Sequence, residues 1–209
     1  MRAYERLIAD DGYEVMLFPL EYMYISQDEG GTTSHQGTYN MDFLGWGENG
    51  RVYQCSYYAP CSCRLVYQSI SGAYNIWEST NKVHTPLGLM NVCFWVAHDD
   101  NVGRYSIGQV LRQGDLLGKT GTSGDVTGDH VHLNVARGLY AGQQQVPPDN
   151  EWQLINSEHI YSIMYVNDTN IIEGMNHPWL TYQGGVTPSK YSKSNFPWVL
   201  YARKLREKR

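Results

Sequence analysis

The sequence predicts a mainly β fold of the α+β class, in which an antiparallel β-sheet forms a groove, with few short helices and long loops. Strand-forming aromatic residues are abundant, with 17 tyrosines and 6 tryptophans among 209 residues. Glycine is also abundant at 21 residues and marks turns along the chain. Short apolar runs follow one another at roughly ten-residue spacing, which is typical of antiparallel β proteins.

The first half of the chain contains one candidate helix and several candidate strands. Residues 3–9 have the spacing of a short helix, and residues 15–25 alternate apolar and aromatic side chains as a strand does. Residues 27–36 are polar and glycine-rich, which predicts a loop. Apolar and aromatic runs between turn residues predict five further strands: 39–46, 50–58, 65–69, 74–77 and 89–98.

The second half of the chain continues the same pattern with fewer strands. Residues 110–118 predict a strand approach and its turn, and the β-branched run at 131–136 predicts a strand. Residues 137–150 predict a loop. Residues 157–163 predict a helix with Ser157 as its N-cap.

Two parts of the chain differ in charge and periodicity. We expect residues 1–175 to form one domain and residues 176–209 a C-terminal appendage, because periodicity is lost near residue 176. Residues 190–209 contain seven basic residues and one acidic residue, a net +6, so the other 189 residues carry −11 of the total of −5. Such a basic end can contact polyanions such as teichoic acids or nucleic acid, but a solvated terminal segment is the simpler interpretation. Four aromatic residues are expected to pack the appendage: Trp179, Tyr182, Trp198 and Tyr201.

The cysteines and the N-terminal residues give no sign of a structural zinc site or of a targeting segment. Cys61 and Cys63 lack the C-x2-C spacing of structural zinc sites, so the four cysteines are expected to be buried free thiols, with two disulfides as the alternative. No run reaches the roughly 18 apolar residues of a membrane span, and residues 1–17 lack a signal-peptide core. We therefore expect delivery without a signal peptide, or a chain that is part of a longer protein.

The most informative stretch is residues 128–135, with the sequence GDHVHLNV. Positions i and i+2 of a strand point to the same face, so His130 and His132 are expected to aim two imidazoles into one pocket. One can bind a metal while the other moves a proton. An H-x-H pair alone is weak, and its value depends on further ligands elsewhere in the chain.

Three upstream residues are candidates for the same pocket. Asp42 lies in an apolar run, where an acid needs a partner, although a hydrogen-bonded turn aspartate is the simpler interpretation. His35 precedes it by seven residues, so a turn or bulge must intervene if both bind one ion. His98 ends the apolar strand where a loop begins, a position that suits a cleft or a surface histidine equally.

A glycine-rich segment leads into the H-x-H strand. Its glycines allow tight turns and close approach of the backbone: Gly114, Gly118, Gly121, Gly124 and Gly128. A phosphate-binding loop is excluded, because no glycine stands five residues before Gly118-Lys119-Thr120 and a strand follows where a helix is required.

In this order, the residues resemble the M23 zinc metallopeptidases, the lysostaphin-like peptidoglycan endopeptidases. The resemblance runs over about residues 31–136, roughly half of the chain. It rests on the glycine ladder ending in G-x-H-x-H and on the apolar strand ending in Ala97-His98. It implies that the groove contains a zinc ion bound by His35, Asp42 and His132, and that His98 and His130 are the unliganded catalytic histidines.

Three features depart from the family pattern. The commonest first motif of the family places the aspartate nearer to the histidine than the seven residues found here. The longer spacing is similar to that of lysin domains on the tail knobs of small tailed phages. Asp129 replaces a usually uncharged residue, and Asn134 stands where a carboxylate is common. The hydrogen-bond partners of the metal ligands are therefore expected to differ from the family pattern.

The chemistry of these residue types agrees with this resemblance. Two neutral imidazoles and one carboxylate leave a zinc centre with a net charge near +1 and an open position. Zinc in such a centre polarises a carbonyl and lowers the pKa of bound water toward about 7. A second pair of imidazoles can then take up and release protons and steady an oxyanion, in roles that the sequence does not divide between His98 and His130.

The leading hypothesis is a zinc endopeptidase that cuts peptide stems or cross-links of bacterial peptidoglycan. The sequence does not reveal which bond is cut, and the family resemblance alone favours the D-Ala–diamino-acid bond over a Gly-rich bridge. The spacing favours a phage tail lysin that opens the cell wall during entry, with other tail proteins as partners. It would act on the virion tail or after release to the cell wall. The alternatives are an inactive domain of the same fold, an endolysin acting at lysis, and an unrelated β protein.

The remaining histidines have no motif support and are interpreted as structural or surface groups: His84, His159 and His177. Tyr39 and Asn40 are candidates to line the cleft. No nucleic-acid partner is expected.

Overall fold

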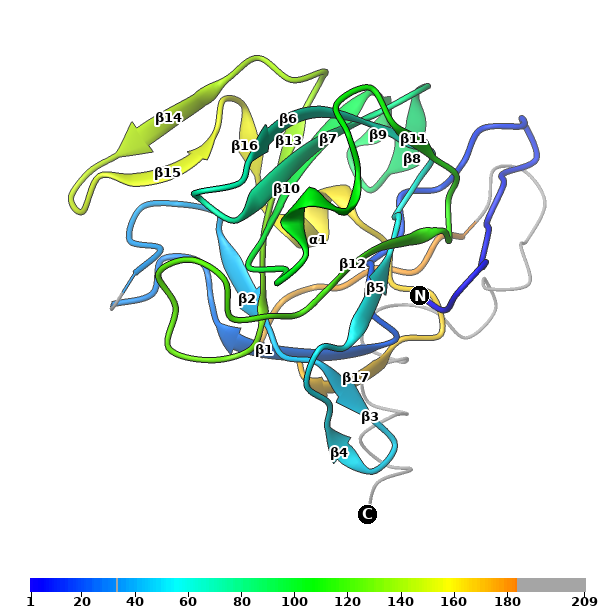
Figure 1. Cartoon of the computed structure of the whole chain (residues 1–209). Helices are drawn as coiled ribbons and strands as arrows, with labels where there is room; N and C mark the ends of the chain where they lie inside the picture. Colours follow the sequence, from blue (N-terminus) through cyan, green and yellow to red (C-terminus); the bar gives the residue numbers. More distant parts are fainter. Residues whose placement is uncertain (33, 184–209) are drawn as a thin grey trace.

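The computed structural model describes residues 1–32 and 34–183, and it is built around one large sheet (Figure 1). Nine strands of the described residues make up this sheet, with β16 paired to β13 beside the main path. The path runs in the order β11 (Val110–Leu111), β6 (Cys63–Ser69), β7 (Tyr74–Ser79), β10 (Val92–Ala97), β13 (Val131–Arg137), β2 (Met41–Phe43), β1 (Tyr22–Gln27) and β17 (Asn170–Glu173); β16 is Ser157–Glu158.

Four two-stranded ribbons and two short helices complete the described part of the chain. The ribbons are β5 (Ser56–Tyr58) with β12 (Leu116–Lys119), β14 (Gln143–Val146) with β15 (Glu151–Leu154), β3 (Trp46–Gly47) with β4 (Gly50–Arg51), and β8 (Val83–Thr85) with β9 (Gly88–Met90). The helices are α1 (Ile160–Ile163) and the 3-10 turn η1 (Val102–Arg104). The strand pairs are antiparallel except β1 with β17, and the predicted mainly β, antiparallel class is confirmed.

The two faces of the sheet are covered unequally. Side chains alternate along β10, so Phe94 and Val96 enter the main core while Trp95 and Ala97 face the other way. The main core also receives α1 and the buried ring of Trp179. Among the described residues, the opposite face packs a small cluster that includes Leu154 of β15. The less covered face is therefore where a cleft can form.

The predicted helix at residues 3–9 is wrong. Tyr4 N–H donates to the carbonyl of Gly114 (2.8 Å), and Leu7 N–H donates to the side chain of Gln113 (2.8 Å). Ile8 forms a β-bridge with Glu14. The segment thus satisfies its backbone groups on neighbouring loops instead of within a helix.

The predicted strands differ from the observed ones mostly where the chain is irregular. Four predictions are confirmed, with small changes of boundary: 65–69 as β6, 74–77 as β7, 89–98 as β9 and β10, and 131–136 as β13. In the 15–25 segment, the strand β1 begins only at Tyr22. The backbones of Leu17 and Pro19 form hydrogen bonds with other loops, which interrupts the predicted strand. The 39–46, 50–58 and 110–118 segments each contain shorter strands separated by turns.

The segment after β13 contains two further corrections. Residues 137–150 are not entirely a loop, because Gln143–Val146 forms β14 and pairs with β15. The predicted 157–163 helix begins only at Ile160, and its N-cap is His159. Ser157 lies in β16, where its hydroxyl donates to the side chain of Asn134 (2.7 Å) and so cannot cap a helix.

Residues 176–183 pack against the main body. Trp179 is 3% exposed and stacks edge-on against Phe18, and Tyr182 is 7% exposed. Trp198, Tyr201 and the basic residues at 190–209 lie outside the described residues. The division at residue 175 stays a prediction.

The four cysteines are free thiols, as predicted, with Cys61, Cys63 and Cys93 buried and Cys55 partly exposed. Burial raises the pKa of Cys93 to about 12, so that thiol is protonated at neutral pH. No helix in the described part of the chain has the length and apolar character that crossing a bilayer requires.

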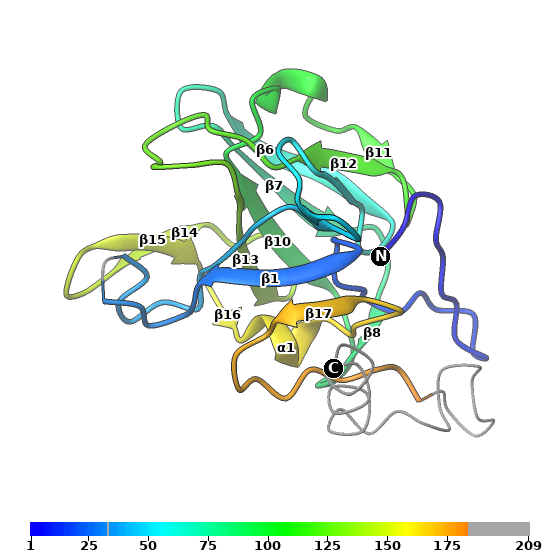
Figure 2. The same ribbon diagram turned by 90° about the horizontal axis from the view of Figure 1, so that it is seen from below.

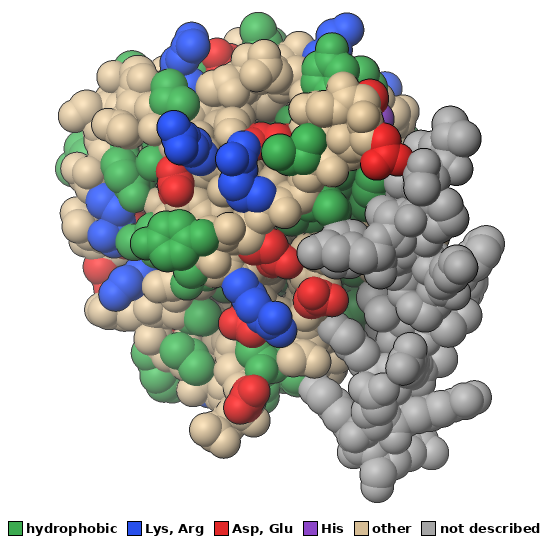
Figure 3. All heavy atoms as spheres, turned by 90° about the vertical axis from the view of Figure 1, so that its right-hand side faces the viewer, with side chains coloured by type: hydrophobic (Ala, Val, Ile, Leu, Met, Phe, Trp, Pro, Cys, Tyr) green, Lys and Arg blue, Asp and Glu red, His purple; other side chains and the backbone are tan. Residues whose placement is uncertain are grey.

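Figures 2 and 3 show two other sides of the molecule. The β14–β15 ribbon and the loop after β1 project together from the same side of the sheet (Figures 1 and 2). A hydrogen bond from Asn40 Nδ2 to the carbonyl of Trp152 (3.0 Å) joins these two segments. On the face with the N-terminal segment, basic and acidic side chains are interspersed (Figure 3).

Candidate metal centre and cleft

A cavity of about 560 Å³ opens on the less covered face of the sheet. All five residues predicted for the site line it: His35, Asp42, His98, His130 and His132. Its walls also include Trp95 from β10 and Trp152 from β15. The cavity therefore lies between the sheet, the loop after β1 and the β14–β15 ribbon.

The register of the sheet brings Asp42 and His132 together. They are cross-strand partners in the β2–β13 pair, and His132 Nδ1 donates to Asp42 Oδ1 (3.0 Å). Met41 and Phe43 point into the core, so alternation turns Asp42 to the cleft face. The partner that an acid in an apolar run needs is thus a histidine.

His35 reaches the same carboxylate from the loop that precedes β2. Its Nε2 lies 3.5 Å from Asp42 Oδ1, and its Nδ1 donates a long hydrogen bond to the carbonyl of Asp28 (3.4 Å). The residue takes the left-handed φ of +69°, and Thr38 N–H closes a turn on its carbonyl. This turn lies between His35 and Asp42, and it allows two residues seven positions apart to face the same site.

His35, Asp42 and His132 form the arrangement expected of a cation site. One ligand atom from each lies within 4.8 Å of the other two, and among the described residues no other such group of His, Cys, Asp or Glu occurs. Ligands about 2.1 Å from a tetrahedral zinc lie about 3.4 Å apart. The observed separations of 3.0 and 3.5 Å from Asp42 Oδ1 match that geometry, and a bound ion would displace the proton through which His132 Nδ1 contacts Asp42. The residues present therefore fit zinc.

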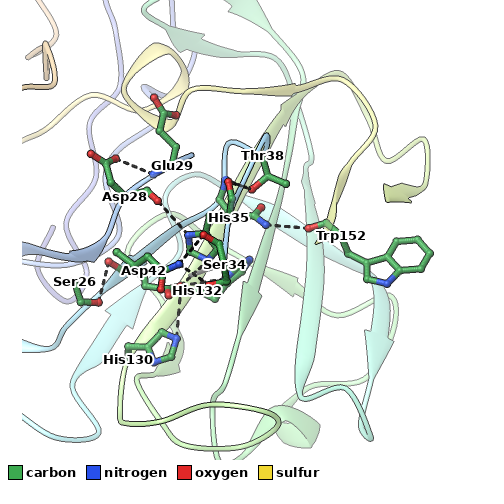
Figure 4. Close-up of polar contacts among 12 residues, drawn as sticks. Ser26, Asp28, Glu29, Ser34, His35, Thr38, Asp42, His130, His132 and Trp152 are labelled. Atoms are coloured by element: carbon green, nitrogen blue, oxygen red, sulfur yellow. Dashed lines mark hydrogen bonds and ion pairs between the residues drawn. The ribbon is translucent and has the colours of Figure 1, made fainter. Parts of the chain in front are cut away.

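Protonation also suits a cation. Burial lowers the pKa of His35 to about 4, so the imidazole is neutral at neutral pH and can offer a lone pair. Burial alone would raise the pKa of Asp42, but the hydrogen bond and charge of His132 lower it overall. The carboxylate is therefore ionised where a cation would sit (Figure 4).

His98 and His130 form a second pair beside this group. Their ring centroids are 4.7 Å apart. His98 Nδ1 donates to the carbonyl of Ser123 (2.9 Å), and His130 Nδ1 donates to the carbonyl of Gly128 (2.8 Å). Because a carbonyl can only accept, Nδ1 carries a proton in both rings, and the neutral form of each ring has Nε2 as an acceptor. Burial, and then the charge of His132, lowers the pKa of His98 to about 4.

The glycine-rich segment is fixed against His98. A side chain at Gly121 would meet the carbonyl oxygen of His98 at 2.2 Å, so only glycine allows this approach. Asp100 accepts from Thr122 N–H (2.8 Å) and from the hydroxyl of Ser123 (3.1 Å). The acid after His98 thus holds the loop whose carbonyl orients the His98 ring.

Asp129 supports His130 from the other direction. Its buried carboxylate accepts from the hydroxyl of Thr120 (2.7 Å) and from Gln54 N–H (2.9 Å), and Arg51 contacts its backbone carbonyl. Asp129 therefore belongs to the scaffold of the site. Asn134, the other departure from the family pattern, accepts from Leu154 N–H (3.0 Å) and Ser157 in that scaffold.

Sequence reasoning missed the two tryptophans of the cleft. Alternation along β10 could have identified Trp95, which is two residues from Ala97, the cross-strand partner of His132. Trp152 could not be found, because the β14–β15 ribbon was not predicted. Tyr39 and Asn40 do not line the cavity; Asn40 is fully buried.

The other histidines each pair with an acid. His84 Nε2 lies 2.9 Å from Asp11, and neither residue lines the cavity. His159 and His177 pair with Glu29 and Asp28, in the loop that contains His35. The interpretation as structural groups agrees with these contacts.

Comparison with known proteins gives a relative among phage proteins and several distant structural likenesses. No protein-family model matches the chain. It is 37% identical over 173 residues to morphogenesis protein 1 of Bacillus phage B103, a match that covers 81% of this chain and 45% of that protein. The chain thus spans about half the length of that curated relative.

Two solved structures are similar over part of the chain. A zinc-containing peptidase from Vibrio cholerae shares 18% identity at a TM-score of 0.44, covering 63% of this chain and 43% of that one. The M23 metalloprotease pseudoalterin, from the deep sea, shares 17% identity at a TM-score of 0.41, covering 72% of this chain and 89% of that one.

Proposed function

We propose that this chain is a zinc-dependent endopeptidase that cleaves peptide stems or cross-links of bacterial peptidoglycan. The observation that carries the proposal is the convergence of His35, Asp42 and His132 on one cation-sized space, with His98 and His130 beside it in the same cavity. Ligand types, spacing and protonation all suit zinc. A structural zinc site is closed by four protein ligands, whereas this group has three.

The five residues divide into holding groups and proton-handling groups. His35, Asp42 and His132 would hold the ion. Zinc, when bound, supplies a Lewis acid that polarises a carbonyl and makes water a nucleophile near neutral pH. His98 and His130 present Nε2 acceptors to the cleft, so one can take a proton from the nucleophile and return it to the leaving amine. The other can stabilise the oxyanion when its Nε2 carries a proton, because only a protonated nitrogen can donate to an oxyanion.

The biological setting is also a proposal. The relative is named a phage morphogenesis protein, which supports a phage product that acts on the virion tail or after release to the cell wall. The long spacing between His35 and Asp42 favours a tail lysin that opens the wall during entry, with other tail proteins as partners. The D-Ala–diamino-acid bond is the preferred target, over a Gly-rich bridge.

The test uses the full 209-residue chain on purified cell walls. We expect about one zinc ion per chain, release of muropeptides, loss of release with EDTA and recovery with added zinc. His132→Ala should lose both zinc and activity, because it removes a ligand. His84→Ala is the matched control, since it removes a histidine that pairs with an acid outside the cleft.

Two results would contradict the proposal. Full hydrolysis by zinc-free His132→Ala would exclude metal-dependent cleavage. Binding of zinc and cell wall without turnover would identify an inactive wall-binding or tail module instead. Mass spectrometry of the released muropeptides identifies the bond that is cleaved. The same assay on walls with diamino-acid cross-links and on walls with Gly bridges compares the two candidate bonds. A polypeptide found only free of virions at lysis would favour an endolysin.

A further inference from the structure

Two adjacent acids at the end of β1 are each paired with a histidine from a distant part of the chain. Glu29 accepts from His159 Nδ1 at 2.7 and 2.8 Å, and Asp28 accepts from His177 Nε2 at 2.7 Å. The histidines lie roughly 130 and 150 residues further along the chain. Together these four residues are called the acid–histidine clamp.

The ring of Tyr161 lies between the two histidines of the clamp. It stacks on His159 with ring centroids 4.8 Å apart and on His177 with centroids 4.9 Å apart, both nearly parallel. Tyr161 also contacts Trp179, which is buried in the main core. The clamp is thereby anchored to the main core.

The other side of the clamp holds His35. The backbone carbonyl of Asp28 accepts from His35 Nδ1, and the N–H of Gly30 donates to the carbonyl of His35 (3.0 Å). Figure 4 shows Asp28 and Glu29 on one side of His35, with His130 on the opposite side. The side chains of Asp28 and Glu29 fix the segment whose backbone orients the imidazole.

We propose that His159 and His177, acting through Glu29 and Asp28, are positioning residues for the metal ligand His35; this rests on the proposed metal site. A hydrogen bond donated by Nδ1 sets the tautomer of His35 and the direction in which its Nε2 points. His35 is in a loop and has a left-handed φ, so its backbone needs outside support to keep that geometry. Part of the chain after residue 175 thus supports the site, although it contributes no ligand.

The chain contains a matched control for this proposal. His84 Nε2 pairs with Asp11 at 2.9 Å and contacts the rings of Tyr13 and Tyr182, so its chemistry and aromatic packing resemble those of His177. It is not among the residues that line the cleft. A general loss of stability would affect both variants, whereas a positioning effect would affect only the clamp.

The experiment measures zinc affinity of the full chain by competition with a chromophoric chelator. His177→Ala should weaken zinc binding by about tenfold or more, the range seen when an outer partner of a metal ligand is lost. His177→Gln should restore most of it, because the glutamine amide nitrogen takes the place of Nε2. His159→Asn should likewise retain more affinity than His159→Ala, since the asparagine nitrogen replaces Nδ1. His84→Ala should bind zinc like the wild type.

A second measurement needs no metal. The amides of Gly30 and Thr38 both donate to the carbonyl of His35. Their hydrogen exchange in metal-free protein should accelerate in His177→Ala and recover in His177→Gln, with no change in His84→Ala. Thermal melting confirms that each variant is folded.

The outcomes separate this inference from the proposed function. Wild-type zinc affinity and unchanged exchange in folded His177→Ala would overturn the clamp, whatever the enzyme does. Tight zinc binding without wall hydrolysis would contradict the proposed function. The zinc affinities of the His177 variants and the wild type would still test the clamp. If the wild type binds no zinc, the metal site and the assignment of the clamp to it are both overturned.

Discussion

At the scale of the residue, the cleft contains two histidines with strained backbone conformations and two histidines whose ring protons are fixed by hydrogen bonds. His35 and His98 have φ of +69° and +77°, a region that non-glycine residues enter at a cost of about 1–3 kcal/mol. Carbonyls of Ser123 and Gly128 hold the protons of His98 and His130 on Nδ1. Such strain persists only where surrounding contacts fix it, as Gly121 and Asp100 do for His98.

The first prediction separates the two kinds of histidine. His98→Ala and His130→Ala should each keep close to one zinc per chain but lower turnover by roughly 10²–10⁴-fold, the usual contribution of general acid–base catalysis. His132→Ala should lose the zinc itself. Elemental analysis and muropeptide release are measured on the same preparations. Loss of zinc in His98→Ala would assign that residue to the ligands instead.

At the scale of the element, strand alternation and one ribbon shape the cleft. Trp152 lies on β15, is 48% exposed and lines the cavity, although sequence periodicity did not identify its strand. The ribbon is tied to the loop of His35 through Asn40 and through Tyr39 N–H, which donates to Gln153 (3.2 Å). A large exposed indole at a cleft wall is suited to contact with substrate.

The second prediction concerns this wall. Trp152→Ala should raise KM several-fold with little change in kcat, because it removes contact area without touching the reacting groups. Leu139→Ala is the control, since Leu139 is 51% exposed and does not line the cavity. Steady-state kinetics on a soluble wall peptide give both constants. An unchanged KM would exclude a substrate contact at Trp152.

At the scale of the whole molecule, the cleft makes the metal-free protein sensitive to acid. Burial lowers the pKa of both His35 and His98 to about 4, whereas an unfolded histidine titrates near about 6.5. Between these values the unfolded state binds more protons than the folded state. The free energy of unfolding therefore falls as pH decreases from about 6.5 to 4.

The third prediction gives this effect a size. Metal-free protein should lose about 3 kcal/mol or more of unfolding free energy between pH 7 and pH 4, measured by urea denaturation. The lowered pKa of Asp42 adds a further loss only below about 4, as that carboxylate becomes protonated. His98→Asn should flatten the profile, because it removes one of the two groups. A flat wild-type profile would contradict the burial of these neutral imidazoles.

Local pattern determined the fold class and placed His130 and His132 on one face of the sheet. Apolar runs and turn glycines predicted the mainly β class, and the central strands β6, β7, β10 and β13 follow those runs. The i, i+2 spacing of His130 and His132 placed both on the cleft face, since alternation is a property of any strand. The five predicted residues do converge in space, while their separate roles stay predictions.

Only the tertiary structure decided what depends on distant contacts. The 3–9 segment is not a helix because its backbone pairs with Gly114 and Gln113, and β14 is a strand because β15 pairs with it. No local signal predicts the clamp, whose partners are roughly 130 and 150 residues apart. Periodicity states which face of a strand a side chain occupies, but which segments meet on that face is settled by packing of the whole chain.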